Sequence, residues 1–237
     1  MATIAENLSR IQSAKADIKT AIEAKGVTVP SSATIDTYAT YVSQISGGGG
    51  GIPMPSNLSA ATLNDYGLLT SAAIKSGVTS IGFQGFYNCK TLISIEIPDS
   101  VTSIDSDAFN GCRILSSIVI PNSVTSIGSS AFYYCSSLSS VTIPNSVTSI
   151  GSSAFYYCSS ITSITIPDSV ESIGDYSFNN CKSLTSVTVN AATPLTLGKK
   201  AFNNSNCPIY VPAESVDAYK SATNWSTYAS RIQAIPT

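Results

Sequence analysis

The residues best suited to chemistry in this 237-residue chain are six cysteines, five of which recur at a spacing of 23 residues. These five are Cys89, Cys112, Cys135, Cys158 and Cys181. Thiols that bind metals or exchange disulfides usually occur in close pairs, and nucleophilic thiols need a nearby base. No two of these cysteines have C-x-x-C spacing, and the chain contains no histidine. We therefore expect a stacked column of buried, reduced thiols that pack as small apolar side chains, in preference to a redox or metal site.

The carboxylates give no catalytic or metal-binding pattern either. Asp99, Asp105 and Asp107 are close in sequence, but no spacing in this region matches a calcium-binding loop. The corresponding positions 23 residues later carry no carboxylate. We interpret the three aspartates as a solvated turn. Without histidine there is also no Ser–His or Cys–His pair, so we expect no enzymatic activity, no cofactor and no metal.

Two pairs of adjacent tyrosines are the most distinctive surface candidates, at Tyr133, Tyr134, Tyr156 and Tyr157. The equivalent positions of neighbouring repeats hold residues such as Asn110, so these positions do not belong to the core. A neutral aromatic patch favours contact with sugars or proteins, because tyrosine offers a large area at little cost in conformational entropy. The four tyrosines are our ligand-binding candidates. The alternative is that they fill the surface by packing over neighbouring turns.

Charge is scarce and excludes some partners. Only 11% of residues are charged, the net charge is −2, and no charged residue lies between Arg113 and Asp168. A surface that follows a phosphate backbone is therefore missing, and we expect no nucleic-acid partner. The N-terminus lacks the basic and apolar regions of a secretory signal, and no segment is long and apolar enough to span a membrane. We therefore expect that the protein does not insert into a membrane and that it is assembled in a cytoplasm.

An internal repeat organises the chain and positions these residues. Residues 120–137 and 143–160 both read IPNSVTSIGSSAFYYCSS, and weaker copies continue the 23-residue period in both directions. A fixed period of this length is typical of a solenoid, in which each unit buries its apolar face against the next. The sequence therefore predicts an α/β solenoid of short strands and single helical turns.

Each repeat contains two predicted strands and one predicted helical turn. Alternating apolar residues such as Ile164 and Ile166 indicate a first strand with one buried face, and a second apolar pair such as Val147 and Ile150 indicates a second strand. A glycine follows, which predicts positive φ at this corner. The helical turn points a phenylalanine inward and carries the cysteine on the same face, three residues later. The phenylalanines are Phe86, Phe109, Phe132, Phe155 and Phe178.

The repeat pattern L-x-x-I-x-I-P-x-S-V-x-S-I-G-x-x-A-F-x-x-C, over residues 77–190, resembles the BspA-like, or Treponema-type, leucine-rich repeat. The resemblance implies a right-handed solenoid and a role in adhesion to host or matrix components, with no catalytic activity. Residues 57–76 are expected to cap its start. Residues 191–237 look like the cap that follows such repeats, with a degenerate repeat around Gly198, Phe202 and Cys207, a strand at 209–211, and helices around 213–221 and 225–232.

The N-terminal region is unrelated to the repeats. Apolar residues at helical spacing predict a helix over residues 4–25, and a second helix follows Gly26 and a short extended link, so we expect a hairpin within residues 1–46. The hairpin is too small to be stable alone, which favours attachment or oligomerisation through its apolar stripe. The alternative is that it folds back on its own chain. The stripe includes Ile4, Leu8, Ile11, Ile18 and Ile22.

Five glycines and two prolines then predict a linker at residues 47–56, so the hairpin and the solenoid are expected to be separate domains. The solenoid domain is expected to comprise an N-terminal cap with five repeats at 57–190 and a C-terminal cap at 191–237.

Residues 3–45 also resemble the start of tail and fibre proteins from phages of gut bacteria. This resemblance implies a virion surface protein, assembled in the host cytoplasm, whose N-terminal module binds other virion proteins and forms a homo-oligomer, with a trimer favoured. The solenoid would then bind a glycan or protein on the bacterial surface. The alternatives are a bacterial cell-surface adhesin of BspA type and a structural decoration protein of the virion without a ligand.

Overall fold

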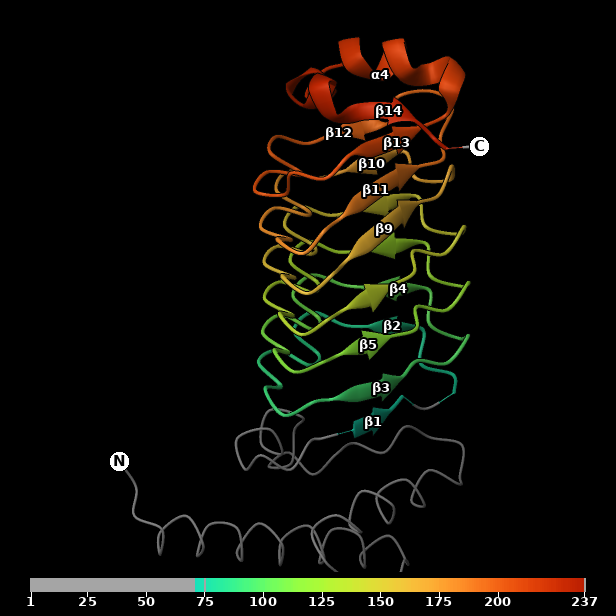
Figure 1. The fold of residues 1–237 in the computed structure, drawn as a ribbon. Helices are drawn as coiled ribbons and strands as arrows, with labels where there is room; N and C mark the ends of the chain where they lie inside the picture. Colours follow the sequence, from blue (N-terminus) through green and yellow to red (C-terminus); the bar gives the residue numbers. More distant parts are fainter. Residues whose placement is uncertain (1–70, 75, 237) are drawn as a thin grey trace, which may run out of the picture.

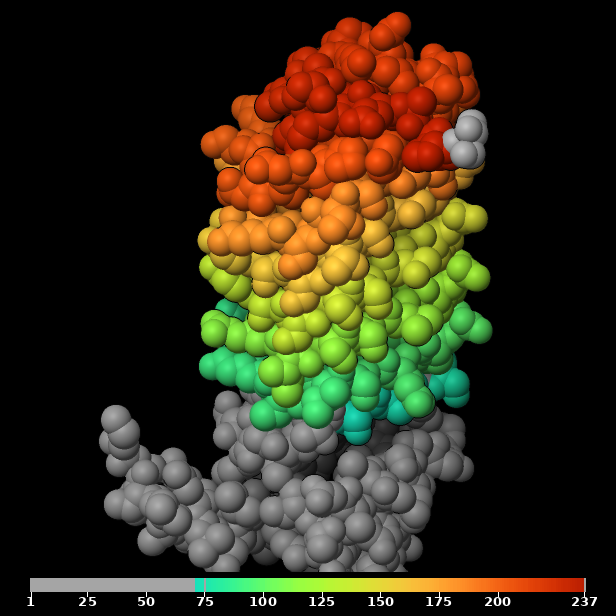
Figure 2. Space-filling model, in the orientation of Figure 1, coloured from blue at the N-terminus to red at the C-terminus, as the bar shows by residue number. Residues whose placement is uncertain are grey.

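The computed structural model describes residues 71–74 and 76–236. They form a solenoid whose coils follow one another along its length in chain order, as Figures 1 and 2 show. The predicted hairpin, the linker and most of the N-terminal cap lie outside the described residues, so these boundaries remain predictions. The oligomerisation candidates lie there too, namely Ile4, Leu8, Ile11, Ile18 and Ile22.

The first side of each coil is a short strand, and these strands pair in parallel within three separate sheets. The strands are β1 (Ser71–Ala73), β3 (Ser94–Glu96), β5 (Ser117–Ile118), β7 (Ser140–Val141), β9 (Ser163–Ile166), β11 (Ser186–Val189) and β13 (Ile209–Val211). They divide into the sheets β1–β3, β5–β7 and β9–β11–β13–β14. The register follows the repeat, since Ile164 of β9 pairs with Val187 of β11. Alternate residues point inward, so the predicted apolar column is buried.

The second side is a continuous parallel sheet of six strands. They are β2 (Ser80–Ile81), β4 (Ser103–Ile104), β6 (Ser126–Ile127), β8 (Ser149–Ile150), β10 (Ser172–Ile173) and β12 (Thr196–Leu197). Hydroxyl groups at the corner before these strands join successive coils: the Ser146 Oγ donates to the Val124 carbonyl at 2.6 Å. The serine and threonine content of the repeat therefore stabilises contacts between coils, as well as supplying polar surface in place of charges.

The third side contains reverse turns where the sequence predicts a single helical turn. In the coil that carries Phe109, Ala108 N donates to Asp105 O, Asn110 N to Asp107 O, and Cys112 N to Phe109 O. These are three linked turns, and the third residue of the first and last turn has positive φ. Every second amide is then free to bond to the next coil, as Phe109 N does to the Ala131 carbonyl at 2.7 Å. The turns thereby join adjacent coils, which a regular helical turn cannot do.

The prediction of positive φ at the corner glycines is wrong. Gly77 and Gly111 are the only described glycines with positive φ, and neither belongs to that column. Glycine recurs at this corner, except in the coil that carries Asp105, because successive coils approach closely there. A Cβ built on Gly151 would lie 2.5 Å from the Ser129 amide nitrogen. A position can favour glycine because its backbone is left-handed or because another backbone segment approaches it closely. At this corner the close approach is the reason.

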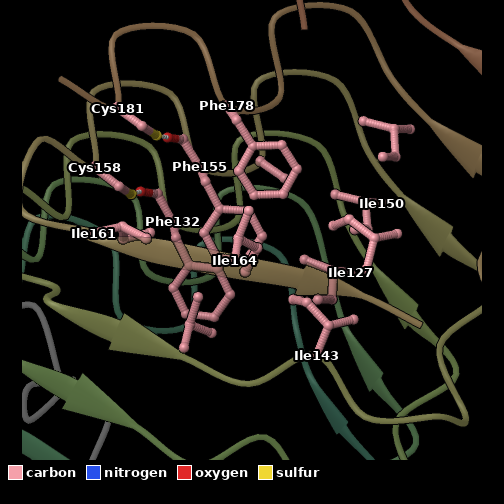
Figure 3. Close-up of a cluster of buried hydrophobic side chains, with 14 of the residues drawn as sticks. Ile127, Phe132, Ile143, Ile150, Phe155, Cys158, Ile161, Ile164, Phe178 and Cys181 are labelled. Carbon is pink, nitrogen blue, oxygen red and sulfur yellow. Dashed lines mark hydrogen bonds between the residues drawn. The ribbon is translucent and has the colours of Figure 1, made fainter. Parts of the chain in front are cut away.

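The core is a stack of six phenylalanines along the solenoid axis. Neighbouring rings lie 5.1–5.4 Å apart between centroids, with interplanar angles of 5–9°. Figure 3 shows three of these rings, beside isoleucines of the two strand sides. The stack comprises Phe86, Phe109, Phe132, Phe155, Phe178 and Phe202, of which all but Phe86 are fully buried.

The C-terminal cap closes the end of this stack. After the strand β13 come the short helices η1 (Ala213–Ser215), α4 (Val216–Ser221) and η2 (Trp225–Arg231), and then β14 (Ile232–Ala234). Trp225 covers Phe202 at 6.0 Å between ring centroids, and its Nε1 donates to the Leu195 carbonyl at 2.9 Å. β14 replaces the end of the helix predicted at 225–232 and pairs in parallel with β13. No helix in the described part of the chain has the length and apolarity to cross a membrane.

Candidate functional site

The four predicted tyrosines lie together on the third side of the two central coils, and we call them the tyrosine cluster: Tyr133, Tyr134, Tyr156 and Tyr157. Tyr133 stacks on Tyr156 with centroids 4.9 Å apart and an interplanar angle of 6°. Tyr134 stacks on Tyr157 at 4.8 Å and 17°. Within the first coil the two rings meet edge to face at 4.8 Å. The cluster therefore has two columns of rings that run along the solenoid axis.

The repeat explains why these rings gather on the surface. Phe132 and Cys135 point into the core, so the two residues between them lie outside it. The 23-residue period then places the second tyrosine pair beside the first, one coil spacing of about 4.8 Å away. All four side chains are partly exposed. The rings thus pack over neighbouring turns, as the surface-filler interpretation expects, and also offer aromatic area to a ligand.

The backbone of the cluster is unfavourable for tyrosine. Tyr134 has φ of 57° and Tyr157 has φ of 58°, a left-handed conformation that costs a residue with a Cβ about 1–2 kcal/mol. In the other coils this position holds residues that tolerate positive φ, namely Asn88, Gly111, Asn180 and Asn204. The fold alone therefore favours asparagine or glycine here. Tyrosine at these two positions therefore costs stability relative to asparagine or glycine.

The coils that follow the cluster carry amides where the cluster has rings. The Asn180 Nδ2 donates to the Asn179 Oδ1 at 2.7 Å, and the Asn204 Nδ2 donates to the Asn180 Oδ1 at 3.1 Å. Asn179 and Asn180 are buried. The expectation that every position between phenylalanine and cysteine lies on the surface is therefore wrong for these two residues, because neighbouring amides cover and satisfy them.

A cation lies against each end of the cluster. The Arg113 guanidinium carbon is 6.0 Å from the ring centroid of Tyr134, and the Lys182 Nζ is 6.0 Å from that of Tyr157. Burial raises the pKa of Tyr133, and the neighbouring phenols raise it further, so this phenol is neutral at physiological pH. The cluster is thus a neutral aromatic surface with a positive charge at each end.

The predicted aspartate turn is engaged in local hydrogen bonds. Asp107 accepts a bond from the Asn110 Nδ2 at 2.6 Å, and Asp105 accepts one from the Ser103 Oγ at 3.0 Å. Within residues 71–74 and 76–236, no group of three or more histidine, cysteine, aspartate or glutamate side chains is placed to hold a metal ion.

The repeated cysteines form the predicted column of free, buried thiols. Each thiol from Cys112 to Cys181 donates to the carbonyl of the phenylalanine 26 residues earlier, at 3.0–3.2 Å. Figure 3 shows two of these bonds, from Cys158 to Phe132 and from Cys181 to Phe155. Burial raises the pKa of Cys158, and raises that of Cys181 to about 12. The thiols therefore act as small apolar side chains with one donor, which accounts for their repetition without a redox role.

Because thiolate is the reactive form, we expect the buried thiols from Cys112 to Cys181 to react with Ellman's reagent at pH 8 only as fast as the native chain unfolds. In guanidinium chloride all six thiols should react. A rapid native reaction of any thiol between Cys112 and Cys181 would contradict the buried column.

The raised pKa of Cys181 also favours the neutral, folded state below the ordinary thiol pKa of about 8.5, and this contribution is lost as the pH rises through about 12. The free energy of unfolding should therefore fall as the pH rises between these two pKa values, and it should fall less steeply in the Cys181→Ala variant.

Comparison with solved structures identifies leucine-rich repeat proteins. The chain is similar to the leucine-rich repeat protein TpLRR of T. pallidum, with a TM-score of 0.55 and 31% identity over 62% of this chain and 68% of that chain. It is also similar to a leucine-rich repeat protein of Bacteroides ovatus, with a TM-score of 0.54 and 32% identity over 66% of this chain and 46% of the other. A likeness to the pneumococcal vaccine antigen PcpA, with a TM-score of 0.58 and 22% identity over 71% of this chain and 42% of that chain, shows the fold alone. This chain thus spans less than half of the last two proteins.

No curated protein matches the chain. None of the matches supports the resemblance of residues 3–45 to phage proteins. The model of the BspA type leucine-rich repeat region, in six copies, matches residues 57–160 and 148–229. The matched residues include every coil described above, with its two strand sides and its phenylalanine stack, and the chain therefore belongs to the BspA-type leucine-rich repeat family.

Proposed function

We propose that this protein is a non-enzymatic adhesin of the bacterial cell surface, which binds its ligand through the tyrosine cluster. The observation that carries the proposal is the pair of ring columns on two central coils, built at positions where the fold favours asparagine or glycine. Membership of the BspA-type family supports a binding role for the solenoid. Two exposed ring columns supply the aromatic area that contacts with glycans and proteins use.

The test exchanges all four tyrosines for asparagine, the residue found at equivalent positions in the neighbouring coils. Because Asn110, Asn180 and Asn204 show that the turns accept asparagine, the variant is expected to fold and to unfold at no lower denaturant concentration. Binding is measured on an array that carries bacterial and host glycans together with matrix proteins. We expect ligands of the wild-type chain to lose most of their signal with the variant. Unchanged binding would contradict the role of the cluster. The control is the single substitution Tyr210→Asn, which removes a tyrosine from another side of the solenoid.

A second candidate is a phage virion surface protein, favoured by the resemblance of residues 3–45 to phage tail and fibre proteins. In this function residues 1–46 attach the chain to other virion proteins and assemble a homo-oligomer, with a trimer favoured, and the solenoid binds the bacterial surface. A third is a virion decoration protein without a ligand, for which removal of the tyrosine cluster leaves host adsorption unchanged.

Localisation separates the adhesin from both virion functions. Brief protease treatment of intact producing cells releases peptides of a surface adhesin, whereas a virion protein is recovered by mass spectrometry from purified particles. Native mass spectrometry of the full chain tests the trimer. A monomer that binds no virion component at assembly concentrations would contradict the virion attachment function.

A further inference from the structure

We infer that the ligand of the tyrosine cluster is a linear acidic polysaccharide that lies along the solenoid axis, an inference that rests on the proposed binding function. The cluster has a direction: its two ring columns run from coil to coil. It also has charged ends, because Arg113 lies against Tyr134 and Lys182 against Tyr157. A chain of sugar rings with acidic groups matches both features.

The two cations belong to one column of the repeat. Arg113, Ser136, Ser159 and Lys182 follow each other at the 23-residue period, directly after the repeated cysteines. Three coil spacings of about 4.8 Å separate the cations along the axis, which amounts to roughly 14 Å. Between them lie the hydroxyls of Ser136 and Ser159, each donating to the backbone of the preceding coil. The column thus presents a cation, two neutral positions and a second cation beside the rings.

The two central coils carry no charge of their own, since no charged residue occurs between Arg113 and Asp168. The coils of the two cations also carry the carboxylates Asp107 and Asp175. Asp107 accepts a hydrogen bond from the Asn110 Nδ2, and Asp175 accepts one from the Lys199 amide. A surface cation over an aromatic ring keeps its positive head exposed to solvent while the ring covers its aliphatic part. Both cations are therefore available to anionic groups of a ligand that lies along the tyrosine columns.

The backbone of this side disfavours a peptide as the ligand. Extended peptides usually bind by adding a strand to a free sheet edge. Here the amides bond to the next coil, as Tyr134 N does to the Tyr156 carbonyl at 2.8 Å, so the described turns offer no such edge in the centre of the solenoid. A sugar chain needs no sheet edge. Because the rings of each column cover each other's faces, it would contact their exposed edges, together with the hydroxyl and charged groups beside them.

The experiment measures binding of the full chain to five polymers: polygalacturonate, its methyl ester, dextran, dextran sulfate and polyglutamate. The variants are Arg113→Gln/Lys182→Gln, the fourfold tyrosine-to-asparagine variant, and a charge-matched control, Lys199→Gln/Lys220→Gln. We expect polygalacturonate to bind, the methyl ester and dextran to bind much more weakly, and the affinity to fall with added salt. The Arg113→Gln/Lys182→Gln variant should lose about tenfold in affinity, while the control retains wild-type affinity.

The outcomes separate this inference from the proposed function. If the tyrosine variant loses a glycan or protein ligand that Arg113→Gln/Lys182→Gln retains, the binding function stands and the acidic ligand is wrong. Equal binding of polyglutamate and polygalacturonate, or an equal loss in the lysine control, would also overturn the inference, because either result means unspecific charge attraction. Binding of dextran sulfate as well as polygalacturonate supports recognition of anionic sugars of either kind, whereas binding of polygalacturonate alone assigns the site to carboxylates.

Discussion

Phe155→Ala is expected to lower the free energy of unfolding by about 3–5 kcal/mol. Phe155 is fully buried and stacks between Phe132 and Phe178, with centroids 5.1 Å from each. Its removal leaves a cavity that the coils cannot close, because the backbone on both sides is fixed by bonds such as Phe155 N to the Ser177 carbonyl. Urea unfolding followed by circular dichroism measures the change, with the slope of the transition checked for a change in cooperativity.

Tyr156→Ser is the matched control, since Tyr156 is the next residue in the same turn and points outward. Its side chain is partly exposed, and its ring lies against the rings of Tyr133, Tyr134 and Tyr157. We expect a loss below about 1 kcal/mol, the range of surface substitutions that break no buried contact. If Phe155→Ala and Tyr156→Ser lower the free energy of unfolding equally, the side chains of these two residues do not point inward and outward as the structure places them.

The strand sides and the core were predictable because a fixed period assigns every repeated position to one face. Once Phe132 and Phe155 occupy the same place in two near-identical repeats, a solenoid stacks them, and the same holds for Ile127 and Ile150. The phenylalanine stack and both apolar columns are therefore present as expected. The column of free thiols followed from the same period, combined with the absence of histidine.

The third side was less predictable because two structures share its pattern. A phenylalanine and a cysteine three residues apart face the same way in a helical turn and in linked reverse turns. The conserved spacing within the chain therefore could not choose between them. The hydrogen bonds from alternate amides to the next coil decide for reverse turns, as in Phe132 N to the Ala154 carbonyl at 2.7 Å.

A signal for the positive φ at Tyr134 and Tyr157 was nevertheless present in the sequence. The other coils hold Asn88, Gly111 and Asn180 there, which are residue types that tolerate a left-handed backbone. Tyrosine at such a position runs against the local backbone preference, and Tyr176 is a further example outside the tyrosine cluster. Arg113 and Lys182 were harder to assign to the candidate site. They are far apart in the sequence, and only the repeat places them in one column beside the tyrosines.

The second large effect is expected at Gly151, where alanine should lower the free energy of unfolding by about 1–3 kcal/mol or more through overpacking. The added Cβ would lie 2.5 Å from the Ser129 amide nitrogen and 2.6 Å from the Gly128 carbonyl carbon. These are backbone atoms, so no side chain can move aside. The coils cannot separate easily either, since Gly151 N donates to the Ile127 carbonyl at 2.8 Å and the Ser177 Oγ donates to the Gly151 carbonyl at 2.8 Å.

Gly82→Ala provides the matched control in the same column of the repeat. Among residues 71–74 and 76–236, no atom lies within 4 Å of a Cβ built on Gly82, and its φ is outside the left-handed region. This substitution should be neutral or stabilise the chain by about 0.4–1 kcal/mol, because alanine restricts the unfolded state. Thermal and urea unfolding of the two variants should therefore change in opposite directions. If Gly151→Ala is as harmless as Gly82→Ala, the coils can separate at this corner, and close approach does not explain the glycine column. If both destabilise equally, the short Cβ distances at Gly151 do not explain the requirement for glycine.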